Sequence, residues 1–277
     1  MEEFPFAFGP DSSLVGILTR PASARSASTA CLLFNAGLLH RVGPHRVNVK
    51  LARALAAQCI PTLRMDLSGL GDSLPAAHSD RYRDQVVADL RAGLSLLQRE
   101  TGADHYLCAG ICSGAIDAYS LALVDQRVGG LFMYDGYAFP TFRTHARLFW
   151  GHLRRTAVAG LPGAIRRFAA RRVEERLRSA QGPGAPSKAA FKLNIETLVD
   201  RGVSIYIAHS GGLPRQHNYA TQMNDAFGEA DFLQRIEHAY LPHLDHTLTT
   251  LSAQQEFIGL VTQWARDVVA KRTQSTR

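Results

Sequence analysis

Short apolar segments alternate with longer amphipathic segments along most of this chain, and the alternation restricts the folds that it can adopt. We expect strands at residues 14–19, 30–35, 62–67, 106–111, 128–134, 203–208 and 236–241, and helices at 47–58, 81–99, 113–124 and 254–270. Strands that are linked through helices pair in parallel and carry helices on both faces of the sheet. The sequence therefore predicts an α/β fold with a mostly parallel sheet, whose binding site lies at the carboxyl ends of the strands.

The alternation breaks between residues 140 and 197, where the sequence becomes arginine-rich and helical, with Gly/Pro-rich loops at 160–163 and 181–186. We interpret this stretch as a helical lid insertion over the strand ends, within a single domain that spans residues 1–277. Residues 141–180 hold ten arginines and two acids, whereas the other residues hold 21 bases and 22 acids. The net charge of +7 thus belongs to one segment, which argues against nucleic-acid binding as the function of the whole fold.

The N-terminus and the cysteines indicate a protein without a membrane span or a metal. The first five residues include two acids and precede no apolar run, unlike a signal peptide, and no apolar run approaches the roughly 18 residues of a span. The four cysteines, at positions 31, 59, 108 and 112, lack the spacing of a zinc site. We therefore expect a cytoplasmic protein with reduced thiols and no metal or organic cofactor.

The strongest local signal is the segment Gly110-Ile-Cys112-Ser-Gly114, between the strand expected at 106–111 and the helix expected from 113. A tight strand-to-helix turn holds its central residue in a strained backbone conformation and requires small residues two positions before and after it. The turn pushes the central side chain out over the sheet edge and points a helix N-terminus at it, which stabilises a thiolate. These features predict that Cys112 is a nucleophile; the alternative is an inert buried thiol between coincidental glycines.

This turn resembles the nucleophile elbow of the α/β-hydrolase superfamily, and the likeness extends over essentially the whole chain. The superfamily usually has serine at the central position, where this chain has Cys112, and no serine here has glycine at both flanking positions. The run from Asp66 to Ser73 resembles the family's Asp-x-x-Gly-x-Gly-x-Ser turn. That likeness implies a structural role for Asp66 and Asp72, not a catalytic one.

The resemblance also implies an oxyanion hole and a histidine base. Residues 35–38 follow a strand where the family carries a His-Gly-type loop, so the backbone N–H groups of Leu38, Gly37 and Ser113 are the expected oxyanion donors. His246 belongs to an Asp-His pair after the last strand, where the family carries its catalytic histidine. It would accept the thiol proton as general base and then return it to the leaving group.

The sequence offers more than one candidate for the acid that orients the base. The loop at 209–217, where the superfamily most often places it, contains no acid. The other superfamily position, after the preceding strand, holds Asp135, which keeps the nucleophile–acid–base order along the chain. Three alternatives stay open: Asp135 has a structural role, the acid is one of the weaker candidates Asp225 and Asp231, or the site is a Cys-His pair without an acid. For the base, His243 is the nearest rival of His246.

A narrower resemblance rests on the runs at 34–46, 110–115 and 135–140, which are similar to the hydrolases associated with the exosortase A system. A cysteine at the elbow is also similar to dienelactone hydrolases and to the acyl-shuttling enzymes of nonribosomal peptide pathways. None of these likenesses implies a particular substrate.

A thiol nucleophile favours acyl transfer from thioesters, because exchange of one thiol for another is nearly isoenergetic and the acyl-enzyme is itself a thioester. We therefore expect a thioesterase or acyltransferase that acts on an acyl thioester. The alternatives are plain ester or lactone hydrolysis by the same fold, and a non-catalytic binding protein. The basic segment predicts an anionic partner, either coenzyme A or an acyl or peptidyl carrier protein, unless its arginines form a solvated helix face. The expected docking residues are Arg154, Arg155, Arg166, Arg167 and Arg171.

Overall fold

The computed structural model describes residues 1–22, 27–76, 81–157, 185–228 and 230–275. Its strands are β1 Glu2–Phe8, β2 Leu14–Arg20, β3 Thr29–Leu33, β4 Thr62–Met65, β5 His105–Ile111, β6 Val128–Tyr134, β7 Ser204–Ser210 and β8 Glu237–Leu241. Its α-helices are α1 Val47–Ala57, α2 Tyr82–Thr101, α3 Ser113–Val124, α4 Phe142–Ala157, α6 Lys188–Asp200, α7 Gln222–Phe227, α8 Phe232–Arg235 and α9 Leu251–Ser275. Short 3₁₀ helices cover Pro10–Ser12 and Pro44–Arg46.

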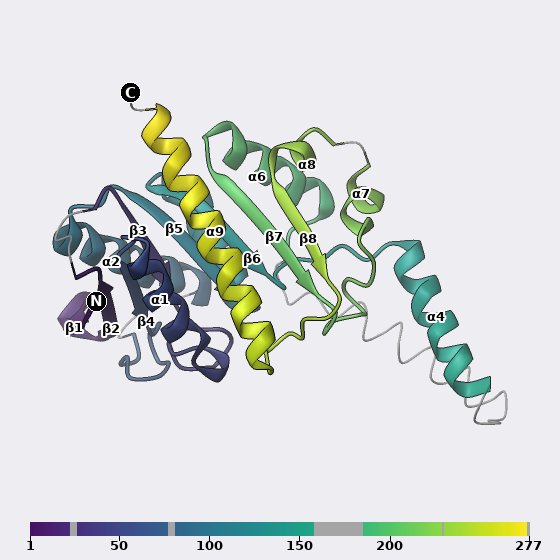
Figure 1. Ribbon diagram of the computed structural model, residues 1–277, viewed down its shortest axis with the longest axis horizontal. Coiled ribbons are helices and arrows are strands. Elements are labelled where there is room, and N and C mark those ends of the chain that lie inside the picture. The colour runs from purple at the N-terminus through teal and green to yellow at the C-terminus, as the bar shows by residue number, and fades with distance from the viewer. Residues whose placement is uncertain (23–26, 77–80, 158–184, 229, 276–277) are drawn as a thin grey trace.

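The strands of the described chain form one eight-stranded sheet in the order β1-β2-β4-β3-β5-β6-β7-β8. β2 pairs antiparallel with both β1 and β4, and every pair from β4 to β8 is parallel. Helices lie on both faces of this twisted sheet (Figure 1). The predicted α/β fold with a mostly parallel sheet is therefore confirmed.

Every strand and helix named from the sequence forms, with differences of a few residues at their ends. β1 is an additional strand that the apolar pattern does not predict. It lies at the edge of the sheet, most of its side chains are exposed, and Pro5 interrupts it. An edge strand tolerates proline and needs no continuous apolar pattern, because one of its sides has no neighbouring strand.

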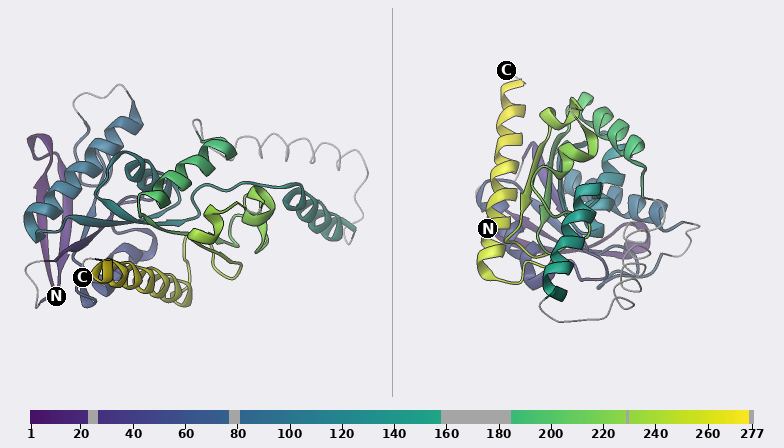
Figure 2. Two further views of the ribbon diagram at one scale, coloured as in Figure 1. Left: turned by 90° about the horizontal axis from the view of Figure 1, so that it is seen from above. Right: turned by 90° about the vertical axis from the view of Figure 1, so that its right-hand side faces the viewer.

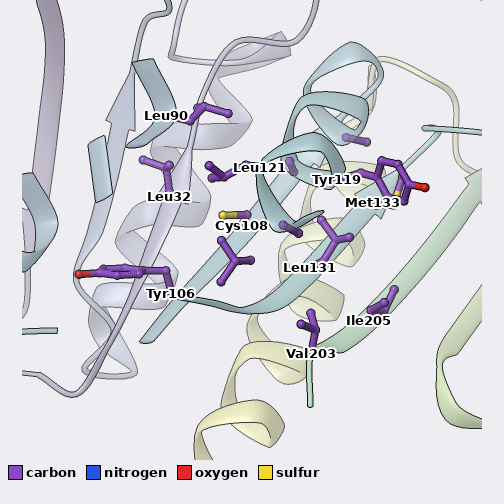
Figure 3. Packing of buried hydrophobic residues seen from close by; sticks show 14 of the residues in the cluster. Leu32, Leu90, Tyr106, Cys108, Tyr119, Leu121, Leu131, Met133, Val203 and Ile205 are labelled. Carbon is purple, nitrogen blue, oxygen red and sulfur yellow. The ribbon is translucent and has the colours of Figure 1, made fainter. Parts of the chain in front are cut away.

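Two hydrophobic clusters hold the helices against the sheet, one on each face (Figure 2). The first packs α2, α3 and α6 against the strands through side chains such as Leu90, Cys108 and Leu131 (Figure 3). The second packs α1 and α9 against the opposite face, through Leu51 and Trp264 among others. Because both faces are covered, the strand ends are held in a fixed arrangement at the edge of the sheet. No helix in the described ranges combines the length and apolar character of a bilayer span.

The insertion expected at 140–197 contains two described helices that differ in position. α6 buries Phe191, Ile195 and Leu198 in the first cluster, so it packs with the body of the fold. α4 stands away from the sheet, near the end where β7 and β8 finish (Figures 1 and 2). The predicted docking residues Arg166, Arg167 and Arg171 lie outside the described residues, as do the side chains of Arg154 and Arg155.

Candidate active site

Side chains suited to acyl-transfer chemistry gather where four neighbouring strands end. Cys112 directly follows β5, Asp135 directly follows β6, Ser210 is the last residue of β7, and His246 lies in the loop after β8. Parallel strands that lie side by side end at the same edge of a sheet. Residues that are up to 134 positions apart in sequence therefore meet at one place.

The turn at Cys112 has the strained backbone that the sequence predicts. Cys112 has φ 58° and ψ −123°, outside the regions that residues other than glycine favour. A Cβ on Gly110 would lie 2.2 Å from the carbonyl oxygen of Gly114, and a Cβ on Gly114 would lie 2.6 Å from the carbonyl oxygen of Asn35. Only glycine fits at either position, so the two glycines allow the close packing that holds the Cys112 side chain half-buried at the sheet edge.

The carboxylate of Asp135 is buried and accepts three hydrogen bonds. His246 Nδ1 lies 2.9 Å from Oδ2, the Ser210 hydroxyl donates to Oδ2 at 2.6 Å, and the Ser210 backbone N–H donates to Oδ1 at 2.7 Å. Asp135 itself has φ 50°, a left-handed conformation that aspartate tolerates better than most residues. The bond to Asp135 occupies Nδ1 of the imidazole and leaves Nε2 for the thiol.

The loop that carries His246 lies close against the loop after β7. A Cβ on Gly211 would lie 2.1 Å from the carbonyl oxygen of Pro242, and a Cβ on Gly212 would lie 2.5 Å from the backbone nitrogen of His246. The Tyr134 hydroxyl also donates to the backbone carbonyl of Asp245 at 2.9 Å. The two glycines after β7 thus allow the loop that carries His246 to pack closely against the loop after β7.

The side chains of Cys112 and His246 are hydrogen-bonded, and this bond shifts both pKa values. The bond to His246 lowers the pKa of the Cys112 thiol, and the imidazolium charge and the Ser113 backbone N–H add to this effect against the opposing effect of burial. The bond to Asp135 raises the pKa of His246 to about 10, with a further contribution from Cys112. Both shifts favour a thiolate beside an imidazolium. Cys108, by contrast, is fully buried and has its pKa raised to about 12.

The expected oxyanion donors lie around the same elbow. The Gly37 backbone N–H donates to the Ser113 hydroxyl at 2.7 Å, so the Ser113 side chain engages one of the three donors. Leu38 is exposed, and its N–H makes no hydrogen bond to any described residue. The Ser113 N–H is the first of α3, where helical N–H groups have no partner within the helix. Leu38 and Ser113 therefore offer the available donors.

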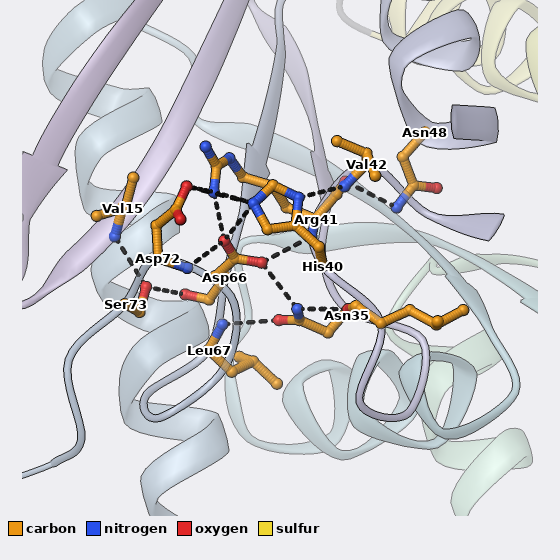
Figure 4. Close-up of polar contacts among 11 residues, drawn as sticks. Val15, Asn35, His40, Arg41, Val42, Asn48, Asp66, Leu67, Asp72 and Ser73 are labelled. Carbon is orange, nitrogen blue, oxygen red and sulfur yellow. Dashed lines mark hydrogen bonds and ion pairs between the residues drawn. The ribbon is translucent and has the colours of Figure 1, made fainter. Parts of the chain in front are cut away.

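The Asp66–Ser73 turn forms a polar network that supports this loop (Figure 4). Asp66 is completely buried and accepts hydrogen bonds from Asn35, from the backbone and guanidinium of Arg41, and from the backbone of Asp72. Asn35 Nδ2 also donates to the Leu39 carbonyl at 2.7 Å, which ties the loop of Gly37 and Leu38 to the network. This arrangement agrees with a structural role for the two aspartates.

The same network contains a side-chain group, His40, Asp66 and Asp72, whose donor atoms are close enough to ligate a metal ion. Arg41 Nη1 already donates to both carboxylates, at 2.7 Å to Asp72. A guanidinium that bridges two carboxylates supplies the positive charge that a cation would bring. The group therefore has the contacts of an ion-pair network.

The rival candidates lie elsewhere. His243 is exposed and bonds to Glu256 at 2.8 Å, Asp225 pairs with Arg143 at 3.5 Å, and Asp231 precedes the short helix α8. In the described chain, neither Asp225 nor Asp231 contacts His246. Ser210 is the site residue that the sequence analysis missed. The signal that could have indicated Ser210 is the absence of an acid at 209–217. When the acid comes from the end of β6 instead, the residue that ends the neighbouring strand β7 lies where it can hydrogen-bond to that acid.

No protein-family model matches the chain, and no curated protein matches it. Solved structures match over nearly its full length. An α/β serine hydrolase homologue from Coxiella burnetii has a TM-score of 0.56 and 18% identity, covering 95% of this chain and 96% of its own. Est1E from Butyrivibrio proteoclasticus has a TM-score of 0.59 and 13% identity, and the match covers 96% of this chain and 99% of its own. The esterase domain of a Rhodothermus marinus protein has a TM-score of 0.55 and 16% identity, and the match covers 96% of this chain and 98% of its own. The fold is that of the α/β hydrolases. At these identities the matches establish the α/β-hydrolase fold and leave the roles of individual residues as predictions.

Proposed function

We propose that this α/β-hydrolase-fold protein cleaves or transfers acyl groups of thioesters through a covalent thioester on Cys112. One observation carries the proposal: a buried carboxylate, Asp135, bonds to Nδ1 of His246, and His246 bonds to a thiol of lowered pKa at a strained strand-to-helix turn. Nucleophile, base and orienting acid in this order are the arrangement of covalent acyl-transfer enzymes.

The reaction begins with attack of the Cys112 thiolate on the carbonyl carbon of the substrate. The carbonyl oxygen gains negative charge, and the N–H groups of Leu38 and Ser113 stabilise it; one such donor contributes roughly 3 kcal/mol. The carbon–sulfur bond of the substrate then breaks. The departing thiolate takes the proton from His246 Nε2, and the acyl group stays on Cys112 as a new thioester.

The second half of the reaction releases the acyl group. Neutral His246 removes a proton from water, or from an acceptor amine or thiol, as that group attacks the acyl carbon. The bond to Cys112 sulfur breaks, and a thiolate beside an imidazolium is restored. Asp135 accepts the hydrogen bond from Nδ1 of His246 and so holds the tautomer in which Nε2 faces the thiol.

Plain ester hydrolysis is the second candidate, because one of the structural neighbours is described as an esterase domain. The two candidates differ in the leaving group. A thiolate of lowered pKa expels another thiolate readily, whereas an alkoxide is a far poorer leaving group than the enzyme's own thiolate. A thioester should therefore react much faster than the oxygen ester of the same acyl group.

The test measures turnover of an acyl thioester and of the oxygen ester of the same acyl group, with matched variants. We expect loss of thioester absorbance on incubation with the protein, and no such loss with Cys112→Ala or His246→Ala. Cys59→Ala, which removes an exposed thiol outside the site, serves as the control and should keep full activity. Equal thioester turnover by Cys112→Ala would overturn the proposal, and a clear preference for the oxygen ester would favour the second candidate.

Docking of coenzyme A or of an acyl or peptidyl carrier by the arginines of the basic segment stays part of the proposal. Its measurable consequence is a KM for an anionic, carrier-bound acyl group that rises steeply with ionic strength. A neutral thioester of the same acyl group should show no such rise. The similarity to exosortase-associated hydrolases likewise stays a prediction.

A further inference from the structure

The side chain of Ser113 connects the two segments that carry the available oxyanion donors. Ser113 directly follows Cys112, and its backbone N–H helps to lower the pKa of the Cys112 thiol. Its Oγ accepts a hydrogen bond of 2.7 Å from the backbone N–H of Gly37, the residue before Leu38. One side chain therefore reaches from the elbow, which carries one donor, to the loop that carries the other.

The Ser113 hydroxyl also has a proton of its own to donate. A serine hydroxyl can accept hydrogen bonds and donate one at the same time. No described residue accepts a hydrogen bond from Ser113 Oγ, the Cys112 sulfur included. The contact with Gly37 lies at the surface, so a molecule bound at Cys112 can reach the hydroxyl. An O–H donor thus remains available one residue away from the reacting thiol.

The oxyanion loop, residues 35–39, is held in place without this hydroxyl. Asn35 Nδ2 donates to the Leu39 carbonyl at 2.7 Å, and Asn35 Oδ1 accepts from the Leu67 N–H at 2.7 Å (Figure 4). The Leu39 N–H donates to the Ala36 carbonyl at 3.1 Å. Because these bonds hold the loop independently of the elbow, a tie to the elbow adds little to its position.

The chemistry at Cys112 gives such a donor a use. Attack of the thiolate places negative charge on the former carbonyl oxygen, and one preorganised donor to that charge accelerates acyl transfer by about 100- to 1,000-fold. A hydroxyl that accepts an N–H bond is polarised by it and becomes a stronger donor. The N–H of Gly37 therefore contributes through the hydroxyl that it engages, instead of directly.

We propose that the Ser113 hydroxyl is a third oxyanion donor, which relays the Gly37 N–H to the carbonyl oxygen of the substrate. It acts beside the backbone N–H groups of Leu38 and Ser113. The hydroxyl donates a hydrogen bond and keeps its proton, so no proton changes place in this step. The inference rests on the proposed acyl chemistry at Cys112, and its test includes a reaction that needs no turnover.

The first measurement is kcat/KM for an acyl thioester, which reports formation of the acyl-enzyme and hence passage through the oxyanion. We expect Ser113→Ala to lower it about 100-fold, the effect of losing one oxyanion donor. Ser113→Thr keeps a hydroxyl on Cβ and should restore most of the activity. Ser95→Ala, which removes an exposed hydroxyl of α2, is the matched control and should equal the parent protein.

Alkylation of Cys112 by iodoacetamide is the readout that a displaced thiol would change. This reaction expels iodide from a saturated carbon and forms no oxyanion, so parent and Ser113→Ala should react at equal rates across pH. Hydrogen exchange of a peptide that covers residues 35–39 should change by no more than the one amide of Gly37, because the loop keeps its own hydrogen bonds.

An aldehyde analogue of the acyl group tests the oxyanion site without turnover. The thiolate of Cys112 adds to the aldehyde carbon, the π electrons of the carbonyl move to its oxygen, and no group leaves. Binding is measured as protection of Cys112 from iodoacetamide. We expect Ser113→Ala to bind the aldehyde about 30-fold more weakly than the parent and Ser113→Thr, the effect of one hydrogen bond to a charged oxygen.

Several outcomes would overturn the inference. Ser113→Ala could match the parent in kcat/KM and in aldehyde affinity, or it could turn over faster, which would mean that the hydroxyl blocks the oxyanion site. Equal slowing of turnover and alkylation would indicate a displaced thiol, and faster exchange throughout residues 35–39 would indicate a tie.

The aldehyde separates this inference from the proposed function. Aldehyde binding that depends on Ser113, in a protein that turns over no thioester, would leave the inference standing and overturn the proposed function. Thioester turnover that does not depend on the Ser113 hydroxyl would do the reverse. A parent protein that neither binds the aldehyde nor turns over thioesters would overturn both.

Discussion

Replacement of Ser210 by alanine tests the support of the orienting acid. The Ser210 hydroxyl donates to the buried Asp135 carboxylate at 2.6 Å and accepts from the Gly212 N–H at 3.1 Å. A hydrogen bond to a charged group contributes about 2 kcal/mol and a neutral one about 1 kcal/mol. We therefore expect Ser210→Ala to lower the free energy of unfolding by about 3 kcal/mol, which corresponds to a Tm lower by about 6–12 °C.

The same substitution should lower activity within a defined limit. The lost bond to the carboxylate, about 2 kcal/mol, limits the fall in kcat/KM to about 30-fold. The backbone N–H of Ser210 still donates to Asp135, so activity should not vanish.

Urea denaturation and thioester turnover measure the two effects. Ser204→Ala, at the half-buried start of the same strand, is the control and should change neither quantity by more than about 0.5 kcal/mol. The reasoning is refuted if Ser210→Ala is as stable and as active as Ser204→Ala.

Two further substitutions test the elbow. His246→Ala removes the bond that lowers the pKa of Cys112, so the thiolate should form at higher pH. The rate of iodoacetamide alkylation, measured against pH, follows thiolate formation. An unchanged pH profile would mean that the helix N-terminus alone sets the pKa of Cys112. Gly114→Ala places a Cβ 2.6 Å from the backbone carbonyl of Asn35, which cannot rotate away. It should cost about 1–3 kcal/mol of unfolding free energy in urea, whereas Gly259→Ala, with open space around its Cβ position, should not; equal stability would contradict the packing argument.

The sequence predicted the architecture because a parallel sheet that is covered on both faces produces a strong β-α alternation. It missed β1, whose edge position permits Pro5 and exposed side chains. It placed Cys112, Asp135 and His246 after strands, and the structure has all three there, since positions after strands follow from the alternation itself. It left the acid open because the bond between Asp135 and His246 spans 111 residues, and no local pattern encodes such a contact.

Other parts of the site depend on loop geometry. The sequence named Gly37 as an oxyanion donor, but only the structure shows that the Ser113 hydroxyl engages its N–H.

Intact-protein mass spectrometry tests the central claim most directly. The protein is mixed with a short-chain acyl thioester, quenched with acid and digested to locate the adduct. We predict one acyl group per chain on Cys112, absent from Cys112→Ala and strongly reduced in His246→Ala. An adduct on the exposed Cys59 alone, or thioester turnover with no acylated protein at any quench time, would contradict a covalent Cys112 thioester.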